Sequence, residues 1–141
     1  MDFYQPITIT ASATLDEDSH AGTVVNLSAA AGLTVTLPAS TGKGAEYTLF
    51  VRTTVTSNNY VIQVANGTDV MQGAVAVASD IAGVTCPTTS TSDTITMNGS
   101  TSGGIIGTTI RLKDVAAGFW SVSGFIVSSG AEATPFSAAV S

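Results

Sequence analysis

The stretch "AGLTVTLPASTGKGAEYTLFV", residues Ala31 to Val51, contains two alternating segments separated by a proline and two glycines. Apolar residues recur at every second position in 33–37 and again in 46–51, which is the period of a strand with one buried face. The proline and glycines between the two segments are typical of a turn. We therefore predict two core strands joined by an exposed hairpin loop, with Lys43 at its tip.

The same alternation extends along most of the chain. Turn residues, such as the Asn-Gly pair at 66–67, separate the alternating segments. We predict strands at 23–27, 33–37, 46–55, 60–65, 69–78, 93–97, 107–115 and 119–128. Many short strands without a long segment of helical period predict an all-β fold, a single-domain β-sandwich or barrel-like (jelly-roll-type) structure.

Two segments depart from this pattern. Thr14 and Glu17 have the spacing of a capping box, and Gly22 can close the turn, so one short helical turn is expected near residues 14–21. Segment 79–92 is rich in Ser and Thr and lacks clear alternation. We interpret it as a surface loop.

The alternation also predicts which side chains enter the core. Tyr47, Leu49 and Val51 should share the buried face of their strand. In the segment "FWSVSGFIV", Trp120, Val122 and Phe125 are expected on one face. This assignment needs a β-bulge, for which Gly124 is the candidate residue.

The chain divides into three parts. Residues 1–12 are predicted to form an N-terminal arm leading into the first strand, 13–128 the β domain, and 129–141 a C-terminal tail. Both ends carry aromatic residues that need a partner surface, in the same chain or a neighbouring one. The candidate capsid or subunit contacts are Asp2, Phe3, Tyr4, Gln5, Pro6, Pro135 and Phe136.

Composition excludes several classes of protein. Charged residues make up only 10% of the chain, which carries a net charge of −6 and four basic residues, so we expect no nucleic-acid partner. No apolar run is long enough to span a membrane, and the N-terminus lacks the features of a signal peptide. Cys86 is the single cysteine, which excludes an intrachain disulfide and predicts a buried thiol.

Candidate catalytic and ligand-binding motifs are weak. The "GKG" at 42–44 lacks the spacing of a phosphate-binding loop. No nucleophile-elbow motif accompanies His20, so a catalytic triad is not expected. The acidic residues 16–18 do not match a calcium-binding loop. We expect His20 and these carboxylates at the ends of the helical turn. Trp120 and Tyr60 are expected in the core rather than in a sugar-stacking platform. We therefore predict no enzyme activity, no cofactor and no metal.

Several motifs, in order, resemble the virion proteins of tailed bacteriophages. They are "LDEDSHAGTVVNLSAAAG" at 15–32, "GLTVTLPASTGKGAEYTLFV" at 32–51, "YVIQVANGTDVMQG" at 60–73 and "GFWSVSGFIVSSGAEATPFS" at 118–137. Together they cover most of the chain. The set is similar to phage head decoration (capsid cement) proteins or to related head-fibre or tail-associated modules.

This resemblance implies a β-domain that forms a homo-oligomer, a trimer, on the outer capsid surface. The implied partner is the major capsid protein, reached by the arm or the tail, in a virion assembled in the bacterial host cytoplasm. A hydroxyl-rich β-domain without an active site is typical of such a structural role. A receptor- or glycan-binding module of a head fibre or tail remains the alternative, and an enzyme such as a polysaccharide depolymerase is a more distant one.

Overall fold

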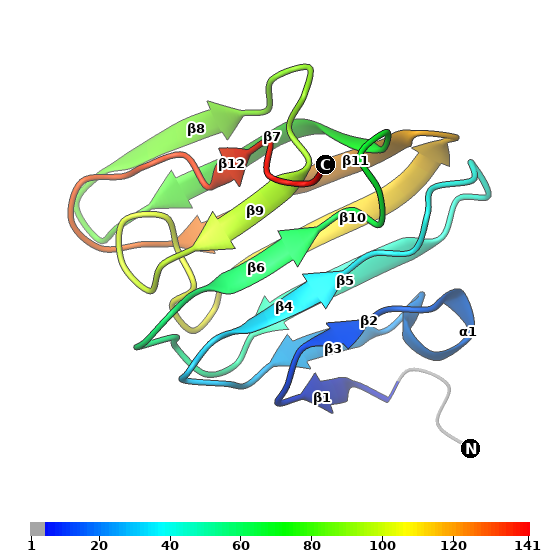
Figure 1. Cartoon of the computed structure of the whole chain (residues 1–141). Coiled ribbons are helices and arrows are strands. Elements are labelled where there is room, and N and C mark those ends of the chain that lie inside the picture. The colour runs from blue at the N-terminus through cyan, green and yellow to red at the C-terminus, as the bar shows by residue number, and fades with distance from the viewer. Residues whose placement is uncertain (1–4) are drawn as a thin grey trace.

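The computed structural model describes residues 5–141, which form two stacked β-sheets (Figure 1). Sheet A has the strand order β1 (Ile7–Ile9), β3 (Val24–Leu27), β5 (Glu46–Val51), β10 (Thr109–Ala116), β11 (Phe119–Val127), β7 (Val70–Ala78) and β8 (Gly83–Pro87). Sheet B has the order β12 (Phe136–Ser137), β9 (Thr94–Met97), β6 (Tyr60–Gln63), β4 (Leu33–Thr36) and β2 (Ala13–Thr14). The prediction of an all-β, sandwich-like fold is confirmed.

The first half of the chain winds between the sheets. Successive strands from β1 to β6 alternate between sheet A and sheet B, and within each sheet they pair in parallel, as β1 with β3 and β4 with β6. The predicted hairpin is therefore wrong: β4 lies in sheet B, whereas β5 lies in sheet A. Alternation alone could not distinguish the two arrangements, because a strand buries one face whether its successor pairs with it or crosses the sandwich.

The second half of the chain is built mainly from antiparallel pairs. β7 pairs with β8 and β10 with β11, while β9 pairs with both β6 and β12. The interpretation of 79–92 as a loop is wrong over Gly83–Pro87, which is β8. This strand lies at the edge of sheet A and exposes four of its five residues, so its sequence shows no apolar alternation.

The core lies between the sheets and contains the predicted residues. Tyr47, Leu49 and Val51 of β5 are buried, as is Cys86. Along β11, Trp120 and Val122 are buried but Phe125 is exposed, which contradicts the prediction for Phe125. The expected bulge at Gly124 is absent, because the β10–β11 register continues through that residue; the irregularity lies between Asp114 and Ala116.

The helical turn is shorter than expected. α1 spans Glu17–His20, and its N-cap is Asp16, whose Oδ1 accepts a hydrogen bond of 2.8 Å from the backbone N–H of Ser19. The predicted capping box is wrong because Thr14 belongs to β2. Gly22, which follows the helix, has a φ of 76°, a conformation that glycine adopts without strain.

Candidate interaction surface

The outer face of sheet A carries exposed apolar side chains. Phe125 is 75% exposed and Phe119 is 48% exposed, and both lie on β11. Val115 of β10 and Val127 of β11 are also among the exposed large hydrophobic residues. Exposed apolar residues that cluster on one face of a small domain are typical of an interaction surface.

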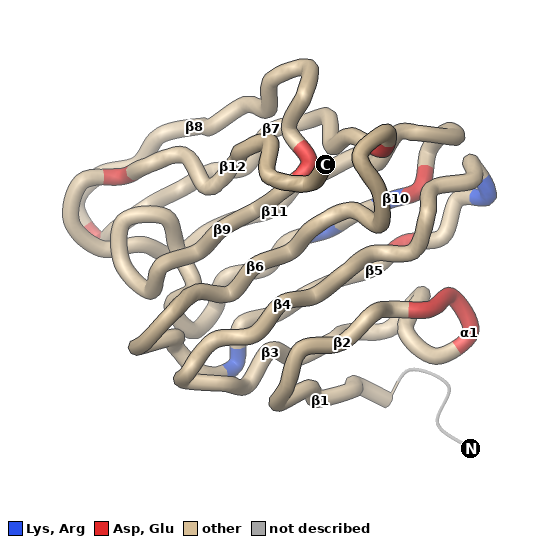
Figure 2. Tube along the Cα trace, in the orientation of Figure 1, with Lys and Arg blue, Asp and Glu red and all other residues tan. Residues whose placement is uncertain are grey.

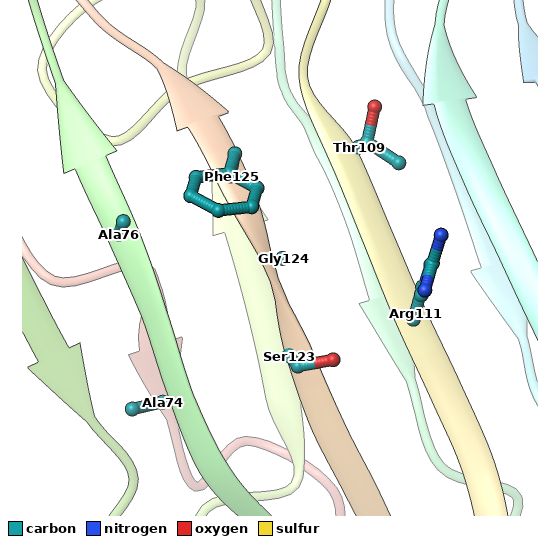
Figure 3. A pocket seen from close by; sticks show the side chains of 7 residues that line it. All are labelled: Ala74, Ala76, Thr109, Arg111, Ser123, Gly124 and Phe125. Carbon is teal, nitrogen blue, oxygen red and sulfur yellow. The ribbon is translucent and has the colours of Figure 1, made fainter.

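A shallow hollow lies at the centre of this face, above β7, β10 and β11 (Figure 3). Its volume is about 490 Å³, comparable to that of ligand pockets. Its floor is lined by small residues, and the phenyl ring of Phe125 and the guanidinium group of Arg111 lie at its sides. The lining residues are Ala74, Ala76, Thr109, Arg111, Ser123, Gly124 and Phe125.

The pairing of the strands explains the hollow. Phe125 lies opposite Thr109 on one side and Ala76 on the other. Gly124 allows close strand packing, because a Cβ at that position would lie 2.2 Å from the carbonyl oxygen of Thr109. The small side chains around Phe125 therefore leave its ring without lateral neighbours, which accounts for its exposure.

Two basic side chains lie on one strand of this face. Arg111 and Lys113 are exposed on β10, whereas Asp16, Glu17 and Asp18 cluster at α1 (Figure 2). Glu46 lies opposite Lys113 in the β5–β10 register. Within residues 5–141 the one ion pair is between His20 and Asp16, so neither Arg111 nor Lys113 has an intrachain ionic partner there.

The predicted contact residues at the N-terminus are only partly described. Asp2, Phe3 and Tyr4 lie outside the described residues. Gln5 and Pro6 are exposed and lead into β1, at the edge of sheet A. The carbonyl of Gln5 accepts a hydrogen bond of 2.9 Å from the hydroxyl of Thr23, the residue directly before β3.

The predicted contact residues of the tail pack on their own domain. Pro135 is buried and its carbonyl accepts a hydrogen bond of 2.8 Å from the N–H of Thr96. Phe136 is half-buried against the core and pairs with Ile95 of β9. Asp93 holds the last residues by accepting bonds from the N–H groups of 139 and 140. A capsid contact at these positions stays a prediction.

The "GKG" loop is occupied by a carboxylate of the protein itself. Asp114 is buried and accepts hydrogen bonds from the N–H of Thr41 at 2.8 Å and the N–H of Gly42 at 2.7 Å. Asp69 accepts a further bond from the N–H of Ser40. The loop donors that would face a phosphate therefore face aspartates, and Lys43 is exposed.

His20 and the acidic residues form a local helix cap. The N–H of Asp16 donates to Nδ1 of His20 at 3.0 Å, and that nitrogen lies 3.4 Å from the Asp16 carboxylate. The hydrogen bonds from Ser19 lower the pKa of Asp16. Across the part of the chain that the structure describes, no three His, Cys, Asp or Glu side chains are grouped closely enough to hold a metal ion.

Trp120 and Tyr60 lie in the core, as predicted. The Trp120 ring packs edge-on against Tyr47, with 5.8 Å between the ring centroids. The Tyr60 hydroxyl donates to the carbonyl of Thr53 at 2.7 Å and accepts from the N–H of Ala29. Neither ring can stack on a sugar. Burial, reinforced by the carboxylates of Glu17, Asp16 and Asp114, raises the pKa of Tyr47 to about 12.

Sequence reasoning missed the residues of the hollow. Phe125 was assigned to the core because Gly124 suggested a bulge. Uninterrupted alternation from Trp120 would have placed Phe125 outside, beside Ser123. Arg111 is one of the four basic residues, and no sequence pattern places it beside Phe125. The small residues of β7 carried no signal that they would lie beside an exposed phenyl ring.

No helix within residues 5–141 is both long and apolar enough to cross a membrane. Comparison of the chain with protein-family models, with curated proteins and with solved structures gave no match.

Proposed function

We propose that this protein is a structural virion protein that binds the outer surface of a phage capsid as an oligomer and stabilises the shell. The observation that carries the proposal is the exposed apolar hollow on the outer face of sheet A. An apolar surface of this kind is stabilised by a protein partner. The motif order that resembles phage decoration proteins supplies the class of partner.

The composition of the domain supports the same function. A shell-stabilising protein needs a stiff scaffold and surfaces for its neighbours, and catalysis is not required. The buried aspartates at 69, 93 and 114 are used to hold loops and the tail. The partners are the major capsid protein and further copies of this chain, with a trimer as the expected oligomer, and neither nucleic acid nor a membrane takes part.

Binding to undecorated heads tests this function. Purified protein should co-sediment with mature heads that lack it, should saturate at a fixed number of copies per head, and should raise the temperature at which the heads release DNA. Heads that already carry the protein serve as the control. Failure to bind undecorated heads would overturn the proposal.

The exposed ring of Phe125 favours a second candidate, a glycan- or receptor-binding module of a head fibre or tail. Aromatic rings beside a guanidinium and hydroxyl groups suit carbohydrate, and Arg111 and Ser123 line the same hollow. A glycan array tests it directly. Binding that is lost in Phe125→Ala and kept in Phe119→Ala would favour this function over capsid decoration.

A further inference from the structure

We infer that the hollow on the outer face of sheet A receives the N-terminal segment Met1–Tyr4 of a second copy of this chain. The inference deepens the proposed function by assigning its subunit contact. It depends on three observations: the chemistry of the hollow, the chemistry of the segment, and the distance between them in one chain.

The hollow suits an aromatic side chain with a carboxylate beside it. Ala74, Ala76 and Gly124 are small and leave room beside the exposed ring of Phe125 (Figure 3). Aromatic rings pack favourably in offset or edge-on arrangements. Arg111 stands at the rim without an ionic partner among the described residues, so a carboxylate that arrives there completes a charge-assisted pair.

The N-terminal segment has this chemistry. Residues 1–4 read Met-Asp-Phe-Tyr, which places a carboxylate directly before two aromatic rings. The segment continues from Gln5, which is exposed at the β1 edge and hydrogen-bonded to Thr23. α1, which carries Glu17 and Asp18, ends shortly before Thr23, to which Gln5 is bonded, so carboxylates lie near Gln5 (Figure 2).

The Phe3 ring of one chain cannot reach Phe125 of the same chain. Ile7 pairs with Val25, and the row continues through Leu49 and Ile110 to Gly124. Ile7 and Gly124 are thus four strands apart, about 19 Å at about 4.8 Å per strand spacing. Gln5 is bonded to Thr23, directly before β3, and β3 is three strand spacings from β11, about 14 Å. Phe3 is two residues from Gln5, which gives a reach of about 7 Å, and its ring adds about 5 Å, about 12 Å in all. A Phe3 ring that packs beside Phe125 must therefore come from another copy.

The contact is heterologous, because the β1 edge of one copy meets the sheet A face of the next. Such contacts close into rings when the rotation between copies allows it. The contact also covers Phe125 with a segment that itself carries two aromatic rings. An oligomer built in this way agrees with the proposed function but is independent of any capsid.

A cross-linking experiment tests the pairing. In a Cys86→Ser background, ¹⁵N-labelled chain with Phe3→Cys is mixed with unlabelled chain carrying Ala76→Cys and then oxidised. The disulfide-linked peptides joining 3 and 76 should form at least about tenfold more than those joining 3 to a Thr56→Cys control, which is exposed elsewhere. The isotope labels ensure that each link joins two chains. Equal linking to both positions would overturn the inference.

Self-association supplies a second measurement. In sedimentation velocity, Phe3→Ala and Ala76→Arg should each weaken association of the full chain about tenfold or more, equivalent to about 1.4 kcal/mol or more. Phe119→Ala is the matched control, because this exposed ring lies on β11 outside the hollow, and it should leave association unchanged. Circular dichroism verifies that each variant is folded.

The outcomes separate the inference from the proposed function. A wild-type chain that is monomeric at all concentrations overturns the inference, even if it binds heads. A chain that cross-links as described but does not bind heads overturns the proposed function and leaves the inference intact. Retained association in Ala76→Arg also overturns the inference, because a partner must then use another surface.

Discussion

The two faces of β11 carry similar aromatic and apolar residues in opposite environments. On the inner face, Trp120 is 1% exposed and packs against Tyr47, and Val122 and Ile126 are equally buried. On the outer face, Phe125 is 75% exposed above a hollow. One strand thus supplies side chains both to the core and to a surface that no other part of residues 5–141 covers.

The comparison shows that apolar content alone does not identify core residues. The inner face is covered by sheet B, and its side chains stabilise the fold by leaving water. The exposed rings of the outer face bury little apolar surface when the chain folds, so they contribute little to stability and can contact a partner. Substitutions on the inner face should therefore lower the free energy of unfolding more than substitutions on the outer face. Substitutions on the outer face should weaken self-association more than those on the inner face.

The largest effect is expected from Trp120→Ala. Removing the indole leaves a cavity between the sheets and should lower the free energy of unfolding by about 3–5 kcal/mol. Phe125→Ala is the matched change on the outer face and should alter it by no more than about 0.5 kcal/mol. Urea denaturation of the monomer measures both. Similar losses in the two variants would contradict the assignment of the faces.

Gly124→Ala should have the next largest effect. The residue has a φ of 150°, and an added Cβ would lie 2.2 Å from the Thr109 carbonyl oxygen, so β10 and β11 would have to separate. We expect a loss of about 2–4 kcal/mol in the free energy of unfolding. Gly118→Ala is the control, since its positive φ costs about 1 kcal/mol but its Cβ meets nothing within 4 Å. Equal losses would mean that the close strand approach is unimportant.

Asp114→Asn tests the one acidic residue buried on the inner side of β10. Its carboxylate accepts bonds from two backbone N–H groups and the hydroxyl of Thr41. An amide keeps the shape but replaces one acceptor by a donor, so we expect a loss of about 1–3 kcal/mol. Asp80→Asn, in an exposed turn, should change stability by less than about 0.5 kcal/mol. Thermal unfolding compares the pair, and an unchanged Asp114→Asn would show that the loop does not need the charge.

Tyr47→Phe should have the smallest effect near neutral pH and a distinct one in alkali. The folded-state pKa is about 12, whereas an unperturbed tyrosine titrates near about 10. Below pH 10 both states keep the proton and the contribution of Tyr47 is fully present. Between about pH 10 and 12 the unfolded state ionises first, so the free energy of unfolding falls as pH rises. Tyr47→Phe should lack this part of the decline; identical pH profiles would contradict it.

Sequence alone predicted the elements better than their connections. The alternation at 33–37 and 46–51 identified two real strands and the buried face of the second one. It could not show that these strands belong to different sheets. β8 escaped prediction because an edge strand needs few apolar residues, and β12 because its two residues are too short to show a period.

Of the candidate interaction surface, the sequence predicted only contact residues at the two chain termini and not the hollow. Phe3 and Tyr4 led to the prediction of a contact segment at the N-terminus, but the hollow combines the β10–β11 hairpin with β7, which is distant in sequence. Ala76, Thr109 and Phe125 are brought into one row by the parallel pairing of β7 with β11 and the antiparallel pairing of β10 with β11. No local pattern encodes that arrangement, since each residue is unremarkable in its own strand.

The sequence by itself determined an all-β chain with a defined set of inward-facing residues and few charges. These properties are local, because the strand period and the turn residues act over a few positions. Only the tertiary structure decided which strands share a sheet, that the chain winds between the two sheets through β6, and that Phe125 lies over an open hollow. Those features depend on contacts between distant segments, where several pairings satisfy the same alternation and packing of the whole sandwich selects one.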